Sequence, residues 1–157
     1  MSIIENVFYD ALVIKNAQNS DEVITYLANY LQEKNYVNEK YCKATLDRER
    51  LYPTGLATKP IGIAVPHSNS ENVLKQAIIV ATINPMVTFT EMGSESSKTE
   101  VGVVIMLALK GEDSHLNYLK NIVNFFKIEE NVSFFYNLNE KEKICTVFKD
   151  DVLQIND

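Results

Sequence analysis

Apolar residues recur along this chain in two patterns, as short continuous runs and as positions with helical spacing. The continuous runs predict buried strands. They lie at residues 6–15, 61–65, 77–83 and 101–109. A proline closes two of them, because the 61–65 run ends at Pro66 and the 77–83 run ends at Asn84-Pro85. The 101–109 run is the longest, so we expect it to form a central strand that is buried on both faces.

Positions with helical spacing lie between these runs. Residues 19–22 (NSDE) have the form of a capping box, and the apolar face that follows predicts a helix. A second helix is expected from Glu39 to about Arg50, before the helix-breaking Pro53 and Gly55. A third starts at residues 111–114, and two shorter helices are predicted at 129–137 and 139–149. The polar stretch 93–98 is expected to be a mobile loop.

Strands that alternate with helices are typical of an α/β sheet with helices on its faces. The chain has 157 residues, a length that fits one domain, so we predict a single domain over residues 1–157. A domain of this size can bury most of its apolar surface and needs no disulfide or metal to fold.

Composition and charge narrow the classes of partner. The net charge of −6 argues against a polyanion, so no nucleic-acid partner is expected. Cys42 and Cys145 lie far apart and outside any CxxC pair, which is typical of reduced thiols in a cytosolic protein. The first residues lack the basic and apolar regions of a signal peptide. The longest apolar run is far shorter than the roughly 20 residues that span a bilayer. We therefore predict a soluble cytoplasmic protein that does not insert into a membrane.

Motifs for several common chemistries are absent. The sequence contains no GxxxxGK[ST], GxSxG or HExxH, and no clustered Cys/His set. No cofactor is expected. A metal shared by the two histidines of the chain and a carboxylate such as Glu112 or Asp113 remains an open alternative.

His67 stands at the end of a predicted buried strand, directly after Pro66. In α/β sheets, strand ends gather ligands and chemistry, and proline both ends the strand and restricts its neighbours. A lone histidine in a loop is also commonly only a solvated side chain, so this position by itself leaves both interpretations open.

Three further side chains are candidates at helix ends. His115 lies at a predicted helix start, where free N–H groups and partial positive charge disfavour imidazolium and favour an anion. Arg48 and Arg50 lie at the end of the second helix, where basic residues commonly just complement the helix dipole. A guanidinium near a strand-end histidine would suit a phosphate dianion.

Three segments together resemble a known family. They are LDRERLYPTGL at 46–56, GIAVPH at 62–67, and VIMLAL at 104–109 followed by EDSHL at 112–116. The chain resembles the IIA components of the phosphoenolpyruvate-dependent sugar phosphotransferase system. Within the mannitol/fructose class it is most similar to galactitol-type IIA proteins. The resemblance extends from about residue 5 to residue 150 and implies a single mixed sheet of about five strands flanked by helices on both faces.

The resemblance also implies a phosphoryl carrier. His67 would accept a phosphoryl group from the phosphohistidine of HPr and pass it to a cysteine of the IIB component, for uptake of a sugar that is expected to be galactitol. The family's second histidine corresponds to His115 and its active-site arginine to Arg48. Thr54, in a matching motif, would be a fourth contact. Many relatives have glycine or another small residue where this chain has Ser68, which puts the local backbone conformation in question.

Imidazole chemistry fits this role, because a neutral ring is a nucleophile without a metal. We expect His67 to react through Nε2 while a hydrogen bond holds the other nitrogen. His115 would donate to the phosphoryl group and Arg48 would neutralise it. Around His67 we expect a shallow apolar surface that binds the partner proteins. By resemblance to the family, Pro53, Val65 and Ile83 would belong to that surface.

Three other functions remain open at this stage. The first is a regulatory IIA-like protein that is phosphorylated on the same histidine. The second is a non-catalytic α/β binding module in which His67 is only structural. The third is a metal-dependent hydrolase.

Overall fold

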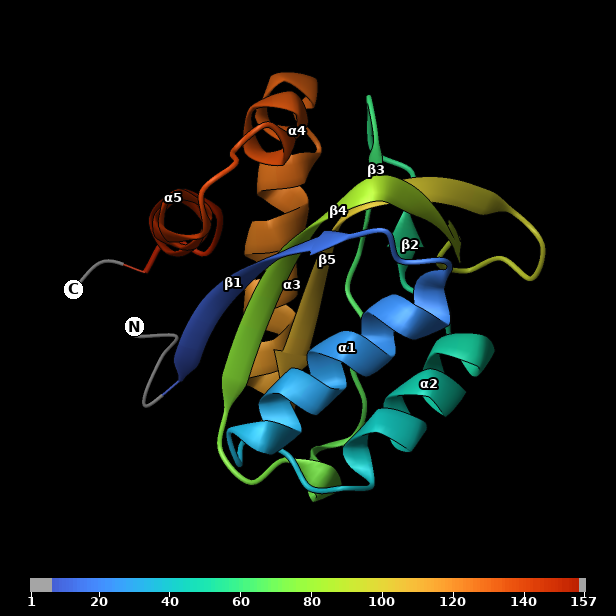
Figure 1. Cartoon of the computed structure of the whole chain (residues 1–157), viewed down its shortest axis with the longest axis vertical. Helices are drawn as coiled ribbons and strands as arrows, with labels where there is room; N and C mark the ends of the chain where they lie inside the picture. The colour runs from blue at the N-terminus through green and yellow to red at the C-terminus, as the bar shows by residue number, and fades with distance from the viewer. Residues whose placement is uncertain (1–6, 156–157) are drawn as a thin grey trace.

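The apolar runs form one five-stranded sheet in the computed structural model, which describes residues 7–155 apart from the side chains of residues 112–114. The strands lie in the order β1 (Phe8–Lys15), β4 (Ala77–Thr90), β5 (Lys98–Ala108), β3 (Gly62–Ala64) and β2 (Gly55–Leu56) (Figure 1). β1 pairs with β4, and β3 with β5, in parallel, whereas β4 with β5 and β2 with β3 are antiparallel. The expected mixed sheet of about five strands is confirmed.

Helices cover both faces of the sheet. On one face lie α1 (Ser20–Glu33) and α2 (Tyr41–Leu51). On the other lie α3 (Glu112–Phe126), α4 (Glu129–Tyr136) and α5 (Lys141–Val147), which a π-helical turn at Phe148–Val152 extends (Figure 1). Within residues 7–155, no helix is both long and apolar enough to cross a membrane.

Two hydrophobic cores lie on opposite faces of the sheet, because successive side chains of a strand point to opposite faces. On β5, Val104 and Met106 belong to the core under α1 and α2, whereas Val103 and Ile105 belong to the core under α3 to α5. All residues of β5 from Val101 to its end are buried, which confirms the predicted central strand. Each such aliphatic side chain stabilises the fold by about 1.5–3 kcal/mol.

The helix start at residue 19 follows from side-chain capping. The Asn19 carboxamide oxygen accepts a hydrogen bond from the Glu22 N–H at 2.9 Å. The Glu22 carboxylate reaches back to the Gln18 N–H at 3.0 Å, one residue earlier than in a strict capping box. The helix begins where the motif predicts.

Three strand predictions differ from the structure. β4 does not end at Asn84-Pro85 but continues to Thr90. Its pairing with β5 shifts register between Thr82 and Val87, so the proline, which has no N–H, lies in the irregular segment where it interrupts no ladder hydrogen bond. β5 begins at Lys98, inside the predicted loop. The two-residue β2 was not predicted, since a strand this short has no periodicity to detect.

The turn from β4 to β5 is held by internal hydrogen bonds. The Glu91 N–H donates to the Ser97 carbonyl at 2.8 Å, and the Ser94 hydroxyl accepts from the N–H groups of Ser96 and Ser97. The polar stretch at 93–98 is therefore a hydrogen-bonded hairpin turn, and its mobility remains a prediction.

Candidate active site

His67 lies just beyond the end of β3. Pro66 ends the strand as predicted, and its carbonyl accepts a hydrogen bond from the Leu107 N–H of β5 at 3.2 Å. His67 itself forms an isolated parallel bridge with Leu107. The ring is half-buried, so the sheet fixes its backbone while solvent still reaches the side chain.

A backbone hydrogen bond selects the tautomer of His67. Its Nδ1 lies 2.8 Å from the carbonyl oxygen of Val65. A carbonyl oxygen can only accept, so Nδ1 carries the proton and donates, and Nε2 keeps its lone pair. The hydrogen bond expected on the second nitrogen is thus made to Val65, a partner that the sequence pattern does not identify.

The second histidine stacks edge-on against the first. His115 lies in the first turn of α3, and the two ring centroids are 4.2 Å apart with the planes at 68°. Burial lowers the pKa of His115 to about 4, helped by the charges of His67 and Arg48. The sequence predicts that the helix start disfavours imidazolium, and the pKa of His115 is indeed lowered. The largest cause, however, is burial of the ring.

The pKa of His67 also lies below its ordinary value. Burial is the main cause, and the positive charge of Arg48 acts in the same direction. The hydrogen bond to the Val65 carbonyl favours the charged ring, so it raises the pKa and opposes the effects of burial and of Arg48. Both imidazoles are therefore neutral at neutral pH, which is the state a nitrogen nucleophile requires.

Of the two candidate arginines, only Arg48 lines the cavity beside the histidines. Its guanidinium carbon lies 5.2 Å from the centre of the Tyr52 ring. Arg50 points elsewhere, because residues two apart on a helix lie on different faces. It pairs with Asp21 at 3.1 Å and with Asp47 at 3.2 Å on the exposed surface.

His67, His115 and Arg48 line one cavity of about 500 Å³, together with the apolar Leu109, Leu116 and Leu119, the segment Ser68–Ser70, Lys110 and Gly111. Two of these side chains carry a buried nitrogen that has no hydrogen-bond partner in the described structure, namely Arg48 Nε and His115 Nε2. Buried polar groups normally have a hydrogen-bond partner, so both nitrogens are candidates to bind a ligand group.

The metal alternative lacks support among the described side chains. No three His, Cys, Asp or Glu side chains that the structure describes come together in a geometry that could hold a metal ion. The side chains of Glu112 and Asp113, which we considered as ligands, lie outside the described residues. Cys42 and Cys145 are both free thiols.

The structure places one expected phosphoryl contact and two residues of the expected docking surface differently. Thr54 is only 4% exposed, and its hydroxyl donates to Glu49 and accepts from the Val65 N–H, so it is not a free contact for a phosphoryl group. Val65 and Ile83 are both 0% exposed and cannot form a docking surface. Strand alternation hides both side chains in the two cores.

Ser68 fits its position without strain. It does not adopt a positive φ, so a glycine is not required there. Its hydroxyl accepts a hydrogen bond from the Thr45 hydroxyl of α2 at 3.2 Å, in a buried environment. Serine in place of the glycine or other small residue of relatives therefore leaves the backbone conformation at this position unstrained.

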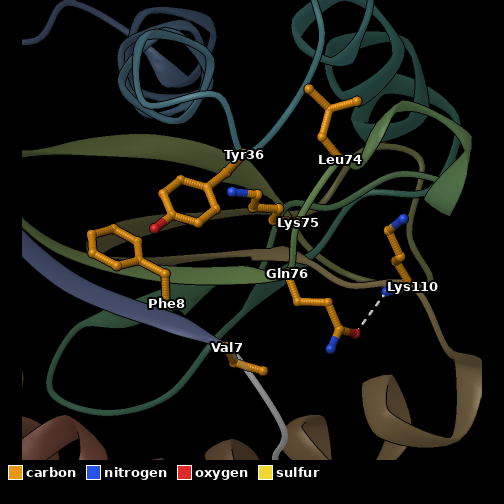
Figure 2. A pocket seen from close by; sticks show the side chains of 7 residues that line it. All are labelled: Val7, Phe8, Tyr36, Leu74, Lys75, Gln76 and Lys110. Carbon is orange, nitrogen blue, oxygen red and sulfur yellow. Dashed lines mark hydrogen bonds between the residues drawn. The ribbon is translucent and has the colours of Figure 1, made fainter.

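A second cavity of about 590 Å³ adjoins the first and shares Lys110 with it. Figure 2 shows its lining, in which the rings of Phe8 and Tyr36 are stacked 4.6 Å apart and the Lys110 N–H donates to the Gln76 side chain. Among the residues that the structure describes, its lining contains no histidine or carboxylate. Both histidines and Arg48 therefore belong to the cavity of about 500 Å³ and not to this one.

The arrangement suits one kind of reaction. A neutral imidazole whose Nε2 keeps its lone pair lines a cavity that is also lined by a guanidinium and a second imidazole. This combination can accept an electrophile that carries negative charge and can balance that charge without a metal.

Comparison with known proteins agrees with the geometry. The family described as phosphoenolpyruvate-dependent sugar phosphotransferase system, EIIA 2, matches residues 6–151. The transcriptional regulator ManR of Bacillus subtilis (strain 168) is 34% identical over 113 residues, which are 67% of this chain and 16% of that protein. The mannitol-specific EIICBA component of Vibrio cholerae is 30% identical over 112 residues, or 69% of this chain and 16% of that protein. The chain thus spans a small part of the length of these two relatives.

A third relative is itself an EIIA component. The galactitol-specific EIIA component of Escherichia coli (strain K12) is 26% identical over 99 residues, which are 63% of this chain and 65% of that protein.

Solved structures share the fold. IIA mannitol from Escherichia coli superimposes with a TM-score of 0.70 and 25% identity, covering 90% of this chain and 94% of that one. The IIA component in a complex of mannitol enzyme IIA with phosphorylated enzyme IIB gives a TM-score of 0.71 at 23% identity, covering 90% and 92%. Since the match to the family extends over nearly all of the described residues, the chain belongs to the EIIA 2 family of the phosphoenolpyruvate-dependent sugar phosphotransferase system.

Proposed function

We propose that His67 carries the phosphoryl group, bonded to Nε2. The observation that supports this most strongly is the hydrogen bond from Nδ1 to the Val65 carbonyl, because it leaves Nε2 as the nucleophilic nitrogen at the cavity. The lowered pKa of the ring keeps that nitrogen unprotonated at neutral pH.

Each half of the transfer is an in-line displacement. The lone pair of His67 Nε2 attacks phosphorus, and the N–P bond of the donor phosphohistidine breaks as the donor imidazole leaves. In the second half, a thiolate of the acceptor attacks the same phosphorus, and the bond to Nε2 breaks. Neutral imidazole is regenerated, so the cycle needs no other reactant.

His115 and Arg48 would bind the transferred group. The Nε2 of His115 and the Nε of Arg48 are the two buried nitrogens that have no partner in the described structure, and both belong to side chains that line the cavity. Charge-assisted hydrogen bonds to phosphoryl oxygens would satisfy them and offset the negative charge of the transition state. His67, His115 and Arg48 are thus our proposed catalytic residues.

The proposed donor is phospho-HPr and the proposed acceptor is a cysteine of a IIB component. Both would have to approach the same cavity, whose open side carries Leu116, a side chain that is 65% exposed. The solved complex of a mannitol IIA with phosphorylated IIB supports an acceptor of this type. We place the protein in the cytoplasm, where both partners would meet it, and treat residues 1–157 as one domain.

Galactitol remains our proposed sugar, on the strength of the sequence motifs. A galactitol-specific relative supports this, although mannitol-specific and regulatory relatives match at higher identity. Uptake of labelled galactitol and mannitol by cells that lack the gene tests the assignment. Selective loss of mannitol uptake would contradict it.

A regulatory role is the second candidate function, and the match to the transcriptional regulator ManR favours it. The site residues would be the same, but phosphorylated His67 would alter binding to another protein instead of feeding sugar uptake. Transfer from the phosphorylated chain to a purified IIB protein separates the two functions, because only a sugar-uptake component should lose its phosphoryl group to IIB.

The proposed chemistry is tested by incubating the chain with phosphoenolpyruvate, enzyme I and HPr, followed by intact mass measurement. We expect a gain of one phosphoryl group that is labile to acid and absent in His67→Ala. Arg50→Ala is the matched control, because Arg50 lies on the exposed surface outside the cavity. Unchanged mass of the parent chain, or full loading of His67→Ala, would contradict the proposal.

A further inference from the structure

A chain of hydrogen bonds runs from the end of α2 to the proposed active-site histidine. The Glu49 carboxylate accepts from the Thr54 N–H through Oε2 and from the Thr54 hydroxyl through Oε1, each at 2.9 Å. The Thr54 hydroxyl oxygen in turn accepts from the Val65 N–H at 3.1 Å. The carbonyl of Val65 accepts from His67 Nδ1 at 2.8 Å.

The register of the sheet explains why Thr54 occupies this place. β2 and β3 pair antiparallel with Gly55 opposite Ala64 and Leu56 opposite Ile63, so the next position sets Thr54 opposite Val65. The ladder has ended there, and the Thr54 hydroxyl replaces the backbone carbonyl that a longer strand would supply. Val65 is thus held at its N–H by a side chain, while its carbonyl is free to hold the histidine.

Partial burial of the Glu49 carboxylate is energetically unfavourable by itself. Burial raises the pKa of its carboxyl, and the two hydrogen bonds from Thr54 oppose that shift. Both Thr54 donors are directed at the carboxylate, so the Thr54 hydroxyl proton is engaged and its lone pair faces Val65. The two hydrogen bonds from Thr54 therefore hold the carboxylate and the Thr54 hydroxyl in one arrangement.

We propose that Glu49 and Thr54 are positioning residues that hold His67 as the Nδ1-protonated tautomer in one ring orientation. This inference rests on the proposed function of His67. If the Val65 backbone moves, Nδ1 loses its acceptor and the proton can transfer to Nε2. That nitrogen then has no lone pair for phosphorus.

The test uses chains labelled with ¹⁵N in histidine. Only two histidines are present, so a His115→Gln variant assigns both rings. In the parent, the His67 nitrogens should give the pattern of one tautomer with the proton on Nδ1. Thr54→Val, which keeps the shape and removes the hydroxyl, should give a mixture of tautomers and should slow phosphoryl acceptance from phospho-HPr by about tenfold, as disruption of a supporting hydrogen bond does at other sites.

Thr54→Ser is the rescue variant, because it restores the hydroxyl, and it should recover the parent's tautomer pattern and rate. Thr45→Val is the matched control, since it removes another buried hydroxyl that bonds near the site, to Ser68. It should lose stability but keep the ¹⁵N pattern of His67. If Thr54→Val does not fold, Glu49→Gln serves instead, since its amide no longer matches both Thr54 donors, and it should shift the tautomer in the same direction.

Two outcomes overturn the inference. The first is a parent-like ¹⁵N pattern of His67 in the Thr54→Val chain, or in Glu49→Gln where that variant is the one used. The second is an equal tautomer shift in Thr45→Val, which would indicate general loosening. The ¹⁵N pattern requires no phosphorylation, so the inference can fail while His67 still accepts a phosphoryl group. Conversely, an unphosphorylated parent would refute the proposed function without changing the tautomer result.

Discussion

Acidification should destabilise the folded chain through His115. Burial, followed by the charges of His67 and Arg48, lowers the pKa of His115 from 6.5 to about 4. The unfolded chain therefore binds a proton at this residue at a higher pH than the folded chain does. The free energy of unfolding should fall as the pH falls from 6.5 toward 4, whereas above 6.5 both states are neutral and the contribution vanishes.

The size of this effect follows from the shift. A change of one in the pKa corresponds to about 1.36 kcal/mol. Lowering the pKa of His115 from 6.5 to about 4 can therefore reduce the free energy of unfolding by at most about 3.4 kcal/mol. The ring is half-buried and lines an open cavity, so water screens part of the interaction. We therefore expect the free energy of unfolding to fall by about 1.5 kcal/mol between pH 6.5 and 4.

Urea unfolding of the parent and of His115→Gln across this pH range measures the effect. Glutamine does not titrate, so the difference between the two pH profiles reports the protonation of His115 together with its coupling to the neighbouring His67. The parent should lose more stability than the variant between pH 6.5 and 4. Identical pH profiles, or an imidazole of His115 that titrates near 6.5 by NMR, would show that the ring is not held in its buried, neutral state.

Further predictions concern single substitutions. Arg48→Ala should slow phosphoryl acceptance and donation by about 10²-fold, because a partly buried cation beside the transferred group is lost, and rapid-quench transfer assays measure both steps; an unchanged rate would remove Arg48 from the mechanism. Arg50→Ala should transfer at the parent's rate and change unfolding free energy by less than about 1 kcal/mol, since its ion pairs are exposed. His115→Ala should still load a phosphoryl group but pass it on more slowly, which single-turnover transfer to IIB can detect. Gly102→Ala should lower the unfolding free energy by about 1–3 kcal/mol in urea titrations, because the added Cβ would lie 2.6 Å from the Tyr136 ring.

The parts of the fold that the sequence predicts correctly are those with a strong local signal. Nine consecutive residues at Val101–Leu109 are too apolar for anything but a central strand. Pro66 ends β3 because it lacks an N–H, and so it places His67 at the tip. Asn19 starts α1 through a hydrogen bond that its side-chain chemistry favours.

The parts that fail depend on pairing across the sheet. The sequence predicts that Asn84-Pro85 ends β4, but the register shift after Thr82 accommodates the proline, and no local pattern indicates that shift. Val65 and Ile83 were expected at the surface on family position alone, and strand alternation buries both.

The candidate site was predicted through motifs and not through geometry. His67, His115 and Arg48 belong to segments far apart in sequence, and only the resemblance joined them before the structure showed that they share one cavity. Thr54 was assigned to the phosphoryl group because it lies in a family motif. Its position opposite Val65 follows only from the β2–β3 register. The sequence therefore does not predict the hydrogen bond that the Thr54 hydroxyl accepts from the Val65 N–H.

The bond between phosphorus and a histidine nitrogen is the most direct test of the account. After phosphorylation of the ¹⁵N-histidine-labelled chain, ³¹P–¹⁵N scalar coupling identifies the bonded atom. The account predicts coupling to Nε2 of His67, with Nδ1 still protonated toward the Val65 carbonyl. Coupling to Nδ1 of His67 or to either nitrogen of His115 would contradict it.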